Sequence, residues 1–421
     1  MSQSAADAAR SAGAAPVDQV AVRRVNLVRV LGEVRSAGPL SRATVARHTG
    51  LTRATVSSLV AELIERRLLR ETDYQQDGTV GRPGRRLEID GRGVAALGLE
   101  VNSRYLAAWS MDLAGRTLQE RRLVYDATRQ DAGHTIRALA ALAAELIDSA
   151  RGTGAHTAGI GVAVPGPVDI ATGLVRSAPN LHWHNVPVGA LLRDLLGLPD
   201  DVSVVVDNEA NLAALAERGH GQSRAADLVY VTGEAGIGAG IVAGGALLRG
   251  SGGFSGELGH IQVDPSGERC ACGRIGCLET KVGLPAAMRT AAPDLANGAA
   301  AGAAAYDPQE QATELLRRAT AGDPQALTGL DAIGRWLGIG LAIPVNLLNP
   351  DVIVLGGYFA AVAPYLMPAA MRELRERAVA GDAAVCRVTG SALGFTAAVR
   401  GAADVIVEEI FADPGRVAAA A

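Results

Sequence analysis

The alternation of apolar and polar residues changes character near residue 92. Before that point, short amphipathic segments predict three helices, at residues 20–38, 42–50 and 53–69. The third helix shows one apolar face at helical spacing, formed by Val56, Leu59, Val60 and Leu63. Beyond residue 92, apolar strands mix with helical segments as far as the C-terminus, which is typical of an α/β body.

Glycines and capping residues predict where the front helices begin and end. Gly38-Pro39 ends the first helix, Ser41 can cap the second, and Thr52 can cap the third. The second helix ends at Gly50, and two short helices joined by a tight glycine turn make a helix-turn-helix. Two strands with a basic, glycine-rich tip between them follow at 68–72 and 85–90. This order predicts a winged helix-turn-helix domain that binds DNA.

Basic and hydroxyl side chains of this front domain suit nucleic acid. Those at the start of the third helix suit base edges and phosphates in the major groove, and wing arginines suit phosphates or the minor groove. We therefore expect DNA contacts from Arg42, Thr52, Arg53, Thr55, Ser57, Ser58, Arg82, Arg85 and Arg86. The alternative is a three-helix module that mediates dimerisation and carries a solvated charged loop.

The rest of the chain predicts a mixed α/β body. Its expected elements are hairpins at 96–118 and 227–250, a strand entering a Gly-Pro turn at 157–169, a strand, loop and helix at 201–217, and a strand at 351–359. The alanine-rich stretch 292–305 is either a frayed helix or a flexible insertion, and an amphipathic helix at 396–411 should pack back on the body. The aperiodic start is expected to be a disordered tail, so the predicted parts are 1–20, 21–92 and 93–421.

Composition and charge narrow the class of protein. The chain is 48% hydrophobic but only 3% aromatic, so a large core must be aliphatic. Residues 21–92 hold 14 Arg against 8 Asp or Glu, whereas the whole chain has a net charge of −4. A basic front on an acidic body favours a nucleic-acid-binding module joined to a larger domain that does not bind DNA. No apolar run predicts a membrane span or signal peptide, so we expect a cytoplasmic protein.

Three of the four cysteines gather in one short stretch. Cys270, Cys272 and Cys277 follow His260 in the pattern H-x9-C-x-C-x4-C. One imidazole and three thiolates complete a tetrahedral zinc shell, and a closed shell indicates a structural rather than a catalytic metal. The alternative is a loop of free or redox-active thiols. The remaining Cys386 is expected to be a buried thiol of a reducing compartment.

Two glycine-rich motifs carry a resemblance to a known family. They are Gly236-Ile237-Gly238-Ala239-Gly240, followed by the stretch GGFSGELGH, and the cysteine motif CACGRIGCLE. With the winged helix-turn-helix in front, the chain resembles the repressor branch of the ROK family of sugar kinases and sugar-responsive repressors, of the xylose-repressor type. The resemblance implies an actin-like, hexokinase-type fold, in which two α/β lobes hold a sugar between them and the C-terminal helix returns to the first lobe.

The resemblance also implies a sugar site. Its expected residues are Gly166, Asn180, Asn208, Glu209, Glu257, His260 and Glu279. Carboxylates and amides of this kind exchange hydrogen bonds with sugar hydroxyls. His260 would bind zinc through one ring nitrogen and the sugar through the other. His182 and His184 flank Trp183 near this set, and we expect them to be surface residues rather than part of the pocket.

The phosphate-binding elements of the family's kinases are altered in this sequence. Their first turn, Asp-x-Gly-Gly-Thr, is replaced by Glu100–Arg104 without glycine, and Gly-Thr-Gly by Glu234-Ala235-Gly236. The catalytic Asp is replaced by Glu209, whose longer side chain shifts the carboxylate. We therefore expect no ATP, no catalytic residue and no enzymatic activity. The alternatives are a drifted but active kinase and a sugar-sensing scaffold whose front end binds protein.

The expected mode of action follows from these parts. A homodimer or a dimer of dimers would place two winged heads on a pseudo-palindromic operator. A sugar in the cleft would shift lobe closure and so change the spacing of the heads.

Overall fold

The computed structural model describes residues 18–72, 85–200, 202–221, 224–300, 307–379 and 386–418, with side chains for all of these except 297–300. The chain divides into two compact units. One comprises Met1–Val94 together with Val407–Ala421, and the other comprises Ala95–Ile406. The predicted boundary at residue 92 is close to the first division, but the C-terminal segment joins the front unit. Most of the predicted tail, residues 1–17, lies outside the described residues.

The front unit is a winged helix, as the sequence predicts. Its elements are α1 (Gln19–Ala37), β1 (Leu40–Ser41), α2 (Arg42–Thr49), α3 (Arg53–Glu65), β2 (Leu69–Thr72) and β3 (Arg86–Ile89). Ser41 and Thr52 cap α2 and α3 by accepting hydrogen bonds from Thr44 N and Thr55 N, each at 3.1 Å. Gly50 ends α2 with a left-handed φ of 68°. The wing strands β2 and β3 pair antiparallel, and β1 adds a short third strand.

The first lobe of the body is built on a five-stranded sheet of order β11-β7-β4-β5-β6. These strands are β4 (Val94–Val101), β5 (Tyr105–Asp112), β6 (Thr117–Val124), β7 (His156–Val164) and β11 (Ser203–Asn208). Helices α4 (Ala132–Gly152) and α5 (Val188–Leu196) pack against it. A small antiparallel sheet lies beside it, formed by β8 (Val168–Asp169), β9 (Leu174–Ala178) and β10 (Trp183–Pro187). The sequence predicts β4, β5, β7 and β11, but it does not predict β6.

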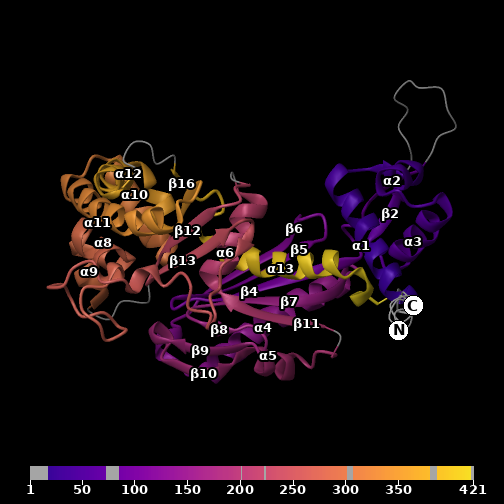
Figure 1. Cartoon of the computed structure of the whole chain (residues 1–421). Coiled ribbons are helices and arrows are strands. Elements are labelled where there is room, and N and C mark those ends of the chain that lie inside the picture. Colours follow the sequence, from indigo (N-terminus) through magenta and orange to yellow (C-terminus); the bar gives the residue numbers. More distant parts are fainter. Residues whose placement is uncertain are drawn as a thin grey trace, which may run out of the picture. The chain divides into compact units, whose positions relative to one another are not determined.

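The second lobe repeats this sheet topology in the order β14-β13-β12-β15-β16. Three strands form an antiparallel meander, namely β12 (Leu228–Gly233), β13 (Ile237–Ala243) and β14 (Ala246–Leu247). Two later strands, β15 (Val352–Gly357) and β16 (Arg387–Gly390), add in parallel. The two-lobe α/β architecture is therefore present, and the second sheet repeats the strand order of the first. Figure 1 labels most of these strands.

Helices α6 (Glu209–His220) and α13 (Ala397–Ala412) pack between the two sheets (Figure 1). Glycines allow this close approach. A Cβ on Gly161 of β7 would lie 1.8 Å from Ala402 O of α13, and one on Gly240 of β13 would lie 2.2 Å from Ala210 O of α6. The part of α13 before Val407 therefore packs against β7 of the first lobe, the lobe to which the C-terminal helix was expected to return.

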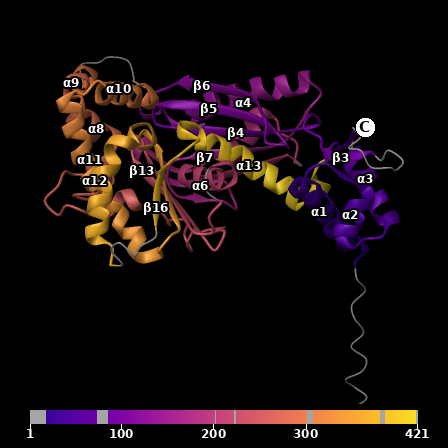
Figure 2. The same ribbon diagram turned by 90° about the horizontal axis from the view of Figure 1, so that it is seen from above.

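Helices fill the remainder of the second lobe (Figure 2). They are α7 (Leu278–Val282), α8 (Leu284–Ala291), α9 (Pro293–Ala300), α10 (Pro308–Thr320), α11 (Pro324–Leu348) and α12 (Tyr358–Arg377). The alanine-rich stretch is thus helical through Ala300, and 301–306 lie outside the described residues. Of the described helices, α11 is long and apolar enough to cross a membrane by length and composition, yet Leu330, Ile333 and Leu337 pack in the core of this lobe.

Candidate functional site

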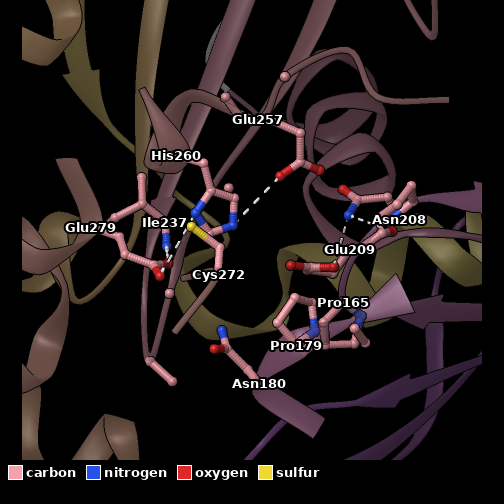
Figure 3. A pocket seen from close by; sticks show the side chains of 18 of the residues that line it. Pro165, Pro179, Asn180, Asn208, Glu209, Ile237, Glu257, His260, Cys272 and Glu279 are labelled. Atoms are coloured by element: carbon pink, nitrogen blue, oxygen red, sulfur yellow. Dashed lines mark hydrogen bonds and ion pairs between the residues drawn. The ribbon is translucent and has the colours of Figure 1, made fainter. Parts of the chain in front are cut away.

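A cavity of about 410 Å³ in the body is lined by residues from both lobes. The first lobe contributes the turn after β7, the end of β9 and the junction between β11 and α6. The second contributes the β12–β13 turn and the loop that precedes α7. All predicted sugar-site residues line this cavity, namely Gly166, Asn180, Asn208, Glu209, Glu257, His260 and Glu279. All of these except Gly166 are labelled in Figure 3. The structure therefore brings together residues that are up to 113 positions apart in the sequence.

Asn208 holds the cavity wall in place through its own hydrogen bonds. Its Oδ1 caps α6 by accepting from Ala210 N at 2.9 Å, and its Nδ2 donates to Gly166 O at 3.1 Å and to Glu209 Oε2 at 3.1 Å. Gly166 has a φ of 82°, and a Cβ there would lie 2.1 Å from Ser177 O. These bonds use the Asn208 amide within the protein, so its geometry fits a positioning role beside its predicted sugar contact.

Three carboxyl groups face the cavity around His260. Glu257 Oε2 lies 3.8 Å from His260 Nε2, and Glu279 Oε1 lies 3.8 Å from Nδ1 of the same ring. Glu209 stands at the first position of α6 (Figure 3). Burial, followed by the charges of Glu257, Glu100 and Glu234, raises the pKa of Glu209 well above its ordinary value. A carboxyl group held protonated can donate a hydrogen bond to a ligand as well as accept one.

Gly236 lies at the narrowest part of this arrangement. A Cβ at this position would lie 2.9 Å from Asn180 Nδ2 and 2.9 Å from Glu279 Oε2. Glu279 Oε2 also accepts a hydrogen bond from Ile237 N at 3.4 Å. The glycine motif of β13 therefore leaves open the space into which an amide and a carboxylate point from opposite lobes.

His260 and the three cysteines form a compact cluster behind this wall. One candidate ligand atom from each of the four residues lies within 4.8 Å of all the others. Cys270 Sγ is 3.7 Å from His260 Nδ1, and Cys272 Sγ is 3.7 Å from Cys277 Sγ. Tetrahedral zinc with sulfur ligands at about 2.3 Å requires sulfur atoms about 3.8 Å apart. The predicted cluster thus forms in a geometry that suits a metal ion, with His260 Nε2 directed away from it toward Glu257.

A second polar network closes the cavity beside the β12–β13 turn, and the sequence did not reveal it. Glu234 Oε2 accepts from Asn102 Nδ2 at 2.7 Å and from Tyr105 OH at 3.4 Å, so it joins the two lobes. Tyr105 OH also donates to Glu100 Oε1 at 2.7 Å. Burial, followed by the charge of Glu100, raises the pKa of Glu234 to about 8, and burial raises the pKa of Glu100 to about 7. Glu100, Asn102 and Glu234 lie in the two stretches that the sequence resemblance aligns with the phosphate-binding turns of the family's kinases.

Other cavity residues were also missed. Phe254 is 58% exposed and lines the cavity, as does the exposed Arg274 beside Cys272. Neither has a sequence signal beyond its place in the loop. His182 and His184 are exposed and do not line the cavity, which agrees with the prediction that they are surface residues.

The predicted DNA-contacting residues fall into two groups on the helix-turn-helix. Arg53 and Ser57 are exposed on one side of α3. Thr55 instead lines a groove between α1 and α3, and Ser58 Oγ lies 3.4 Å from Arg23 Nη2 of α1. Thr52 is exposed and caps α3. Ser58 is nevertheless exposed, so Arg53, Ser57 and Ser58 all remain accessible on α3, whereas Thr55 is half-buried.

Arg42 of α2 and Arg85 of the wing are arranged around one carboxylate. Glu71 of β2 pairs with Arg42 at 2.8 Å and with Arg85 at 3.0 Å. Arg42 also donates to Ser57 O at 3.3 Å, so it links α2, α3 and the wing. Arg86 begins β3 opposite Thr72. Arg82, which the sequence predicts at the tip of the wing, lies outside the described residues.

The family assignment follows from both units. A model of the ROK family matches residues 96–409, and a model of the MarR family matches residues 28–78. The first match covers most of the chain, so the protein belongs to the ROK family and carries a MarR-like winged helix in front of the ROK body.

Particular relatives are regulators with both parts. The chain is 26% identical to a xylose repressor of Caldicellulosiruptor bescii over 396 residues, covering 93% of this chain and 98% of the relative. It is 32% identical to the DNA-binding transcriptional dual regulator NagC of Escherichia coli over 352 residues, covering 83% and 84%.

Solved structures show the same relationship. The structure of a ROK family transcriptional regulator, a homologue of the E. coli MLC protein, superposes with a TM-score of 0.74 at 28% identity, covering 93% of this chain and 97% of that one. A ROK family glucokinase from Streptomyces griseus, solved with glucose and AMPPNP, superposes at 0.63 and 28% identity, covering 74% and 98%. The regulator thus matches the front unit as well, whereas the kinase covers a smaller share of the chain.

Proposed function

We propose that the protein is a sugar-responsive transcriptional regulator, a repressor whose affinity for operator DNA changes when a sugar binds in the cavity of the ROK body. The observation that carries the proposal is the presence on one chain of a helix-turn-helix and a cavity lined by Asn180, Glu257, His260 and Glu279. The relatives that match nearly the whole chain are named as sugar repressors or DNA-binding regulators. Such a protein acts in the cytoplasm.

A structural zinc ion supports this sugar site. His260, Cys270, Cys272 and Cys277 would hold it, and their spacing fits its preferred ligands. The ion would fix the orientation of the His260 ring, leaving Nε2 free to bond a sugar hydroxyl next to Glu257. It has no place in a reaction, because the four protein ligands close its shell.

Phosphoryl transfer fits the cavity poorly. Asn102 and Glu234 bond to each other where the polyphosphate of a nucleotide would have to lie, and no described lysine lines the cavity. The protein would therefore bind a sugar without phosphorylating it. The kinase alternative predicts sugar-dependent ATP hydrolysis in a coupled assay with a panel of hexoses, and turnover above the rate without sugar would revive it.

DNA recognition would use the exposed side of α3 and the wing. Arg53 and Ser57 are placed to reach base edges or phosphates, and a homodimer or dimer of dimers would present two such heads to a pseudo-palindromic site. The scaffold alternative assigns the front unit to a protein partner. It predicts that Arg53→Ala leaves DNA affinity unchanged, whereas the regulator predicts a weaker complex.

A thermal-shift screen of free sugars and sugar phosphates tests the ligand function most simply. A ligand of the native body raises its melting temperature by mass action. A sugar that raises the melting temperature should also change DNA affinity. A screen in which no sugar of either kind shifts the melting temperature would remove the basis of the proposal.

A further inference from the structure

The charge around the cavity is strongly one-sided. Four carboxyl groups line it, from Glu209, Glu234, Glu257 and Glu279. The basic side chains of the described lining are Arg274, which is exposed, and His260, whose Nδ1 faces the cysteines. A ligand in this cavity therefore meets many hydrogen-bond acceptors and very little positive charge.

The hydrogen-bond donors near Glu234 that could neutralise an anion already have partners within the protein. The amide of Asn102 donates to the Glu234 carboxylate at 2.7 Å. The Arg122 guanidinium stacks 3.4 Å from the centre of the Tyr105 ring, but it pairs with both oxygens of Asp307, each at 2.8 Å. Neither donor is directed at the cavity in a way that would neutralise a phosphate.

Phosphate esters need positive charge, and among the described lining residues Arg274 is the one arginine. A phosphate carries up to two negative charges, and proteins bind it through arginine, lysine or clustered backbone N–H groups. Ionised carboxylates a few ångströms away repel it, and Glu234, whose pKa is raised to about 8, is such a carboxylate above that pH. A neutral sugar suits the lining, because its hydroxyl groups donate to carboxylates. An amino group suits it too, because an ammonium is attracted to them.

We propose that the effector of this cavity is an unphosphorylated sugar, neutral or carrying an amino group, and that Glu234 excludes sugar phosphates and other anionic sugars. This inference rests on the proposed function, because it names the ligand class of the same site. It also assigns a role to Glu234, which stands in the stretch that replaces the Gly-Thr-Gly loop of the family's kinases.

Matched pairs of ligands test the inference. The probes are glucose with glucose 6-phosphate, N-acetylglucosamine with its 6-phosphate, and glucosamine. Each is titrated by calorimetry against the full-length protein at pH 8.5, where the Glu234 carboxyl, with its pKa of about 8, is mostly ionised. For every pair that binds, the free sugar should bind at least tenfold more tightly than its phosphate. A phosphate ester that binds as tightly as the free sugar, or more tightly, overturns the inference while leaving the sugar-responsive function intact.

A pair of variants tests whether Glu234 causes the preference for a free sugar over its phosphate. Glu234→Gln keeps the shape of the side chain and removes its charge, so the tenfold ratio should narrow. Glu376→Gln makes the same change at a site that is 73% exposed in the ion pair with Arg377, and it should leave the ratio as it is. An unchanged ratio in Glu234→Gln contradicts the assignment. If no probe binds in either form, both the sugar-binding function and this inference are overturned.

Discussion

Replacement of Glu100 by Gln should change how the stability of the body depends on pH. The Glu100 side chain is 2% exposed, and burial raises its pKa from 4.5 to about 7. Because the folded state holds the proton more tightly than the unfolded state, the stabilisation is complete below pH 4.5 and is lost as the pH rises through about 7. The difference between these two pKa values corresponds to about 3 kcal/mol in the free energy of unfolding.

Ionisation of Glu234 should lower the free energy of unfolding further, at slightly higher pH. Its pKa is raised to about 8, so its contribution to stability is lost between pH 4.5 and about 8. Glu100→Gln removes only the first contribution. The amide oxygen of Gln can still accept the hydrogen bond from Tyr105. Its buried amide NH2 group lacks a partner, which costs about 1 kcal/mol at every pH. The variant should be slightly less stable than wild type at pH 5 and more stable at pH 8.5.

Urea unfolding at pH 5, 7 and 8.5 measures this crossover. All three tryptophans, at positions 109, 183 and 336, belong to the body, so their fluorescence reports that unit. The exposed Glu376→Gln should keep the pH dependence of wild type. If wild type and Glu100→Gln lose the same free energy of unfolding between pH 5 and 8.5, the pKa of Glu100 is not raised and the account of the buried carboxyl network is wrong.

Three further changes test other parts of the account. Gly236→Ala should abolish the thermal shift caused by sugar, because its methyl group enters the space between Asn180 and Glu279, whereas Gly152→Ala, with nothing within 4 Å, should preserve it. Cys272→Ser should lower the metal content below about one ion per chain and reduce the melting temperature, and Cys386→Ser should keep the metal; equal metal contents would count against the site. Arg53→Ala should weaken DNA binding about tenfold and reduce its salt dependence, with Arg137→Ala on α4 as the charge-matched control, and equal affinities would exclude Arg53 from the interface.

The front unit could be predicted closely because its signals are local. Ser41 and Thr52 cap helices within three residues of themselves, and Gly50 adopts the left-handed conformation that ends α2. The apolar face of α3 follows directly from helical periodicity, and its four residues are buried as predicted. The sequence did not predict which polar residues of α3 contact α1, since Arg23 of α1 bonds to Ser58 from 35 positions away.

The body was predicted in outline but not in its contacts. Strand β6 has no apolar alternation, because its residues are exposed or half-buried at the edge of the sheet, so the sequence left it unassigned. The expected loop before α6 is absent, since Asn208 caps the helix directly at the end of β11. The bond between Asn102 and Glu234 joins residues 132 positions apart, and no spacing rule brings such a pair together.

The most direct measurement of the central claim is DNA affinity with and without a bound sugar. Duplexes selected from a random pool by the full-length protein would be titrated by fluorescence anisotropy, in parallel with a scrambled duplex and at two salt concentrations. The account predicts a preference for the selected duplex, an affinity that falls with salt, and a change of at least about fivefold when a sugar that raises the melting temperature is saturating. Equal affinity for both duplexes, or an affinity that the bound sugar leaves unchanged, would contradict it.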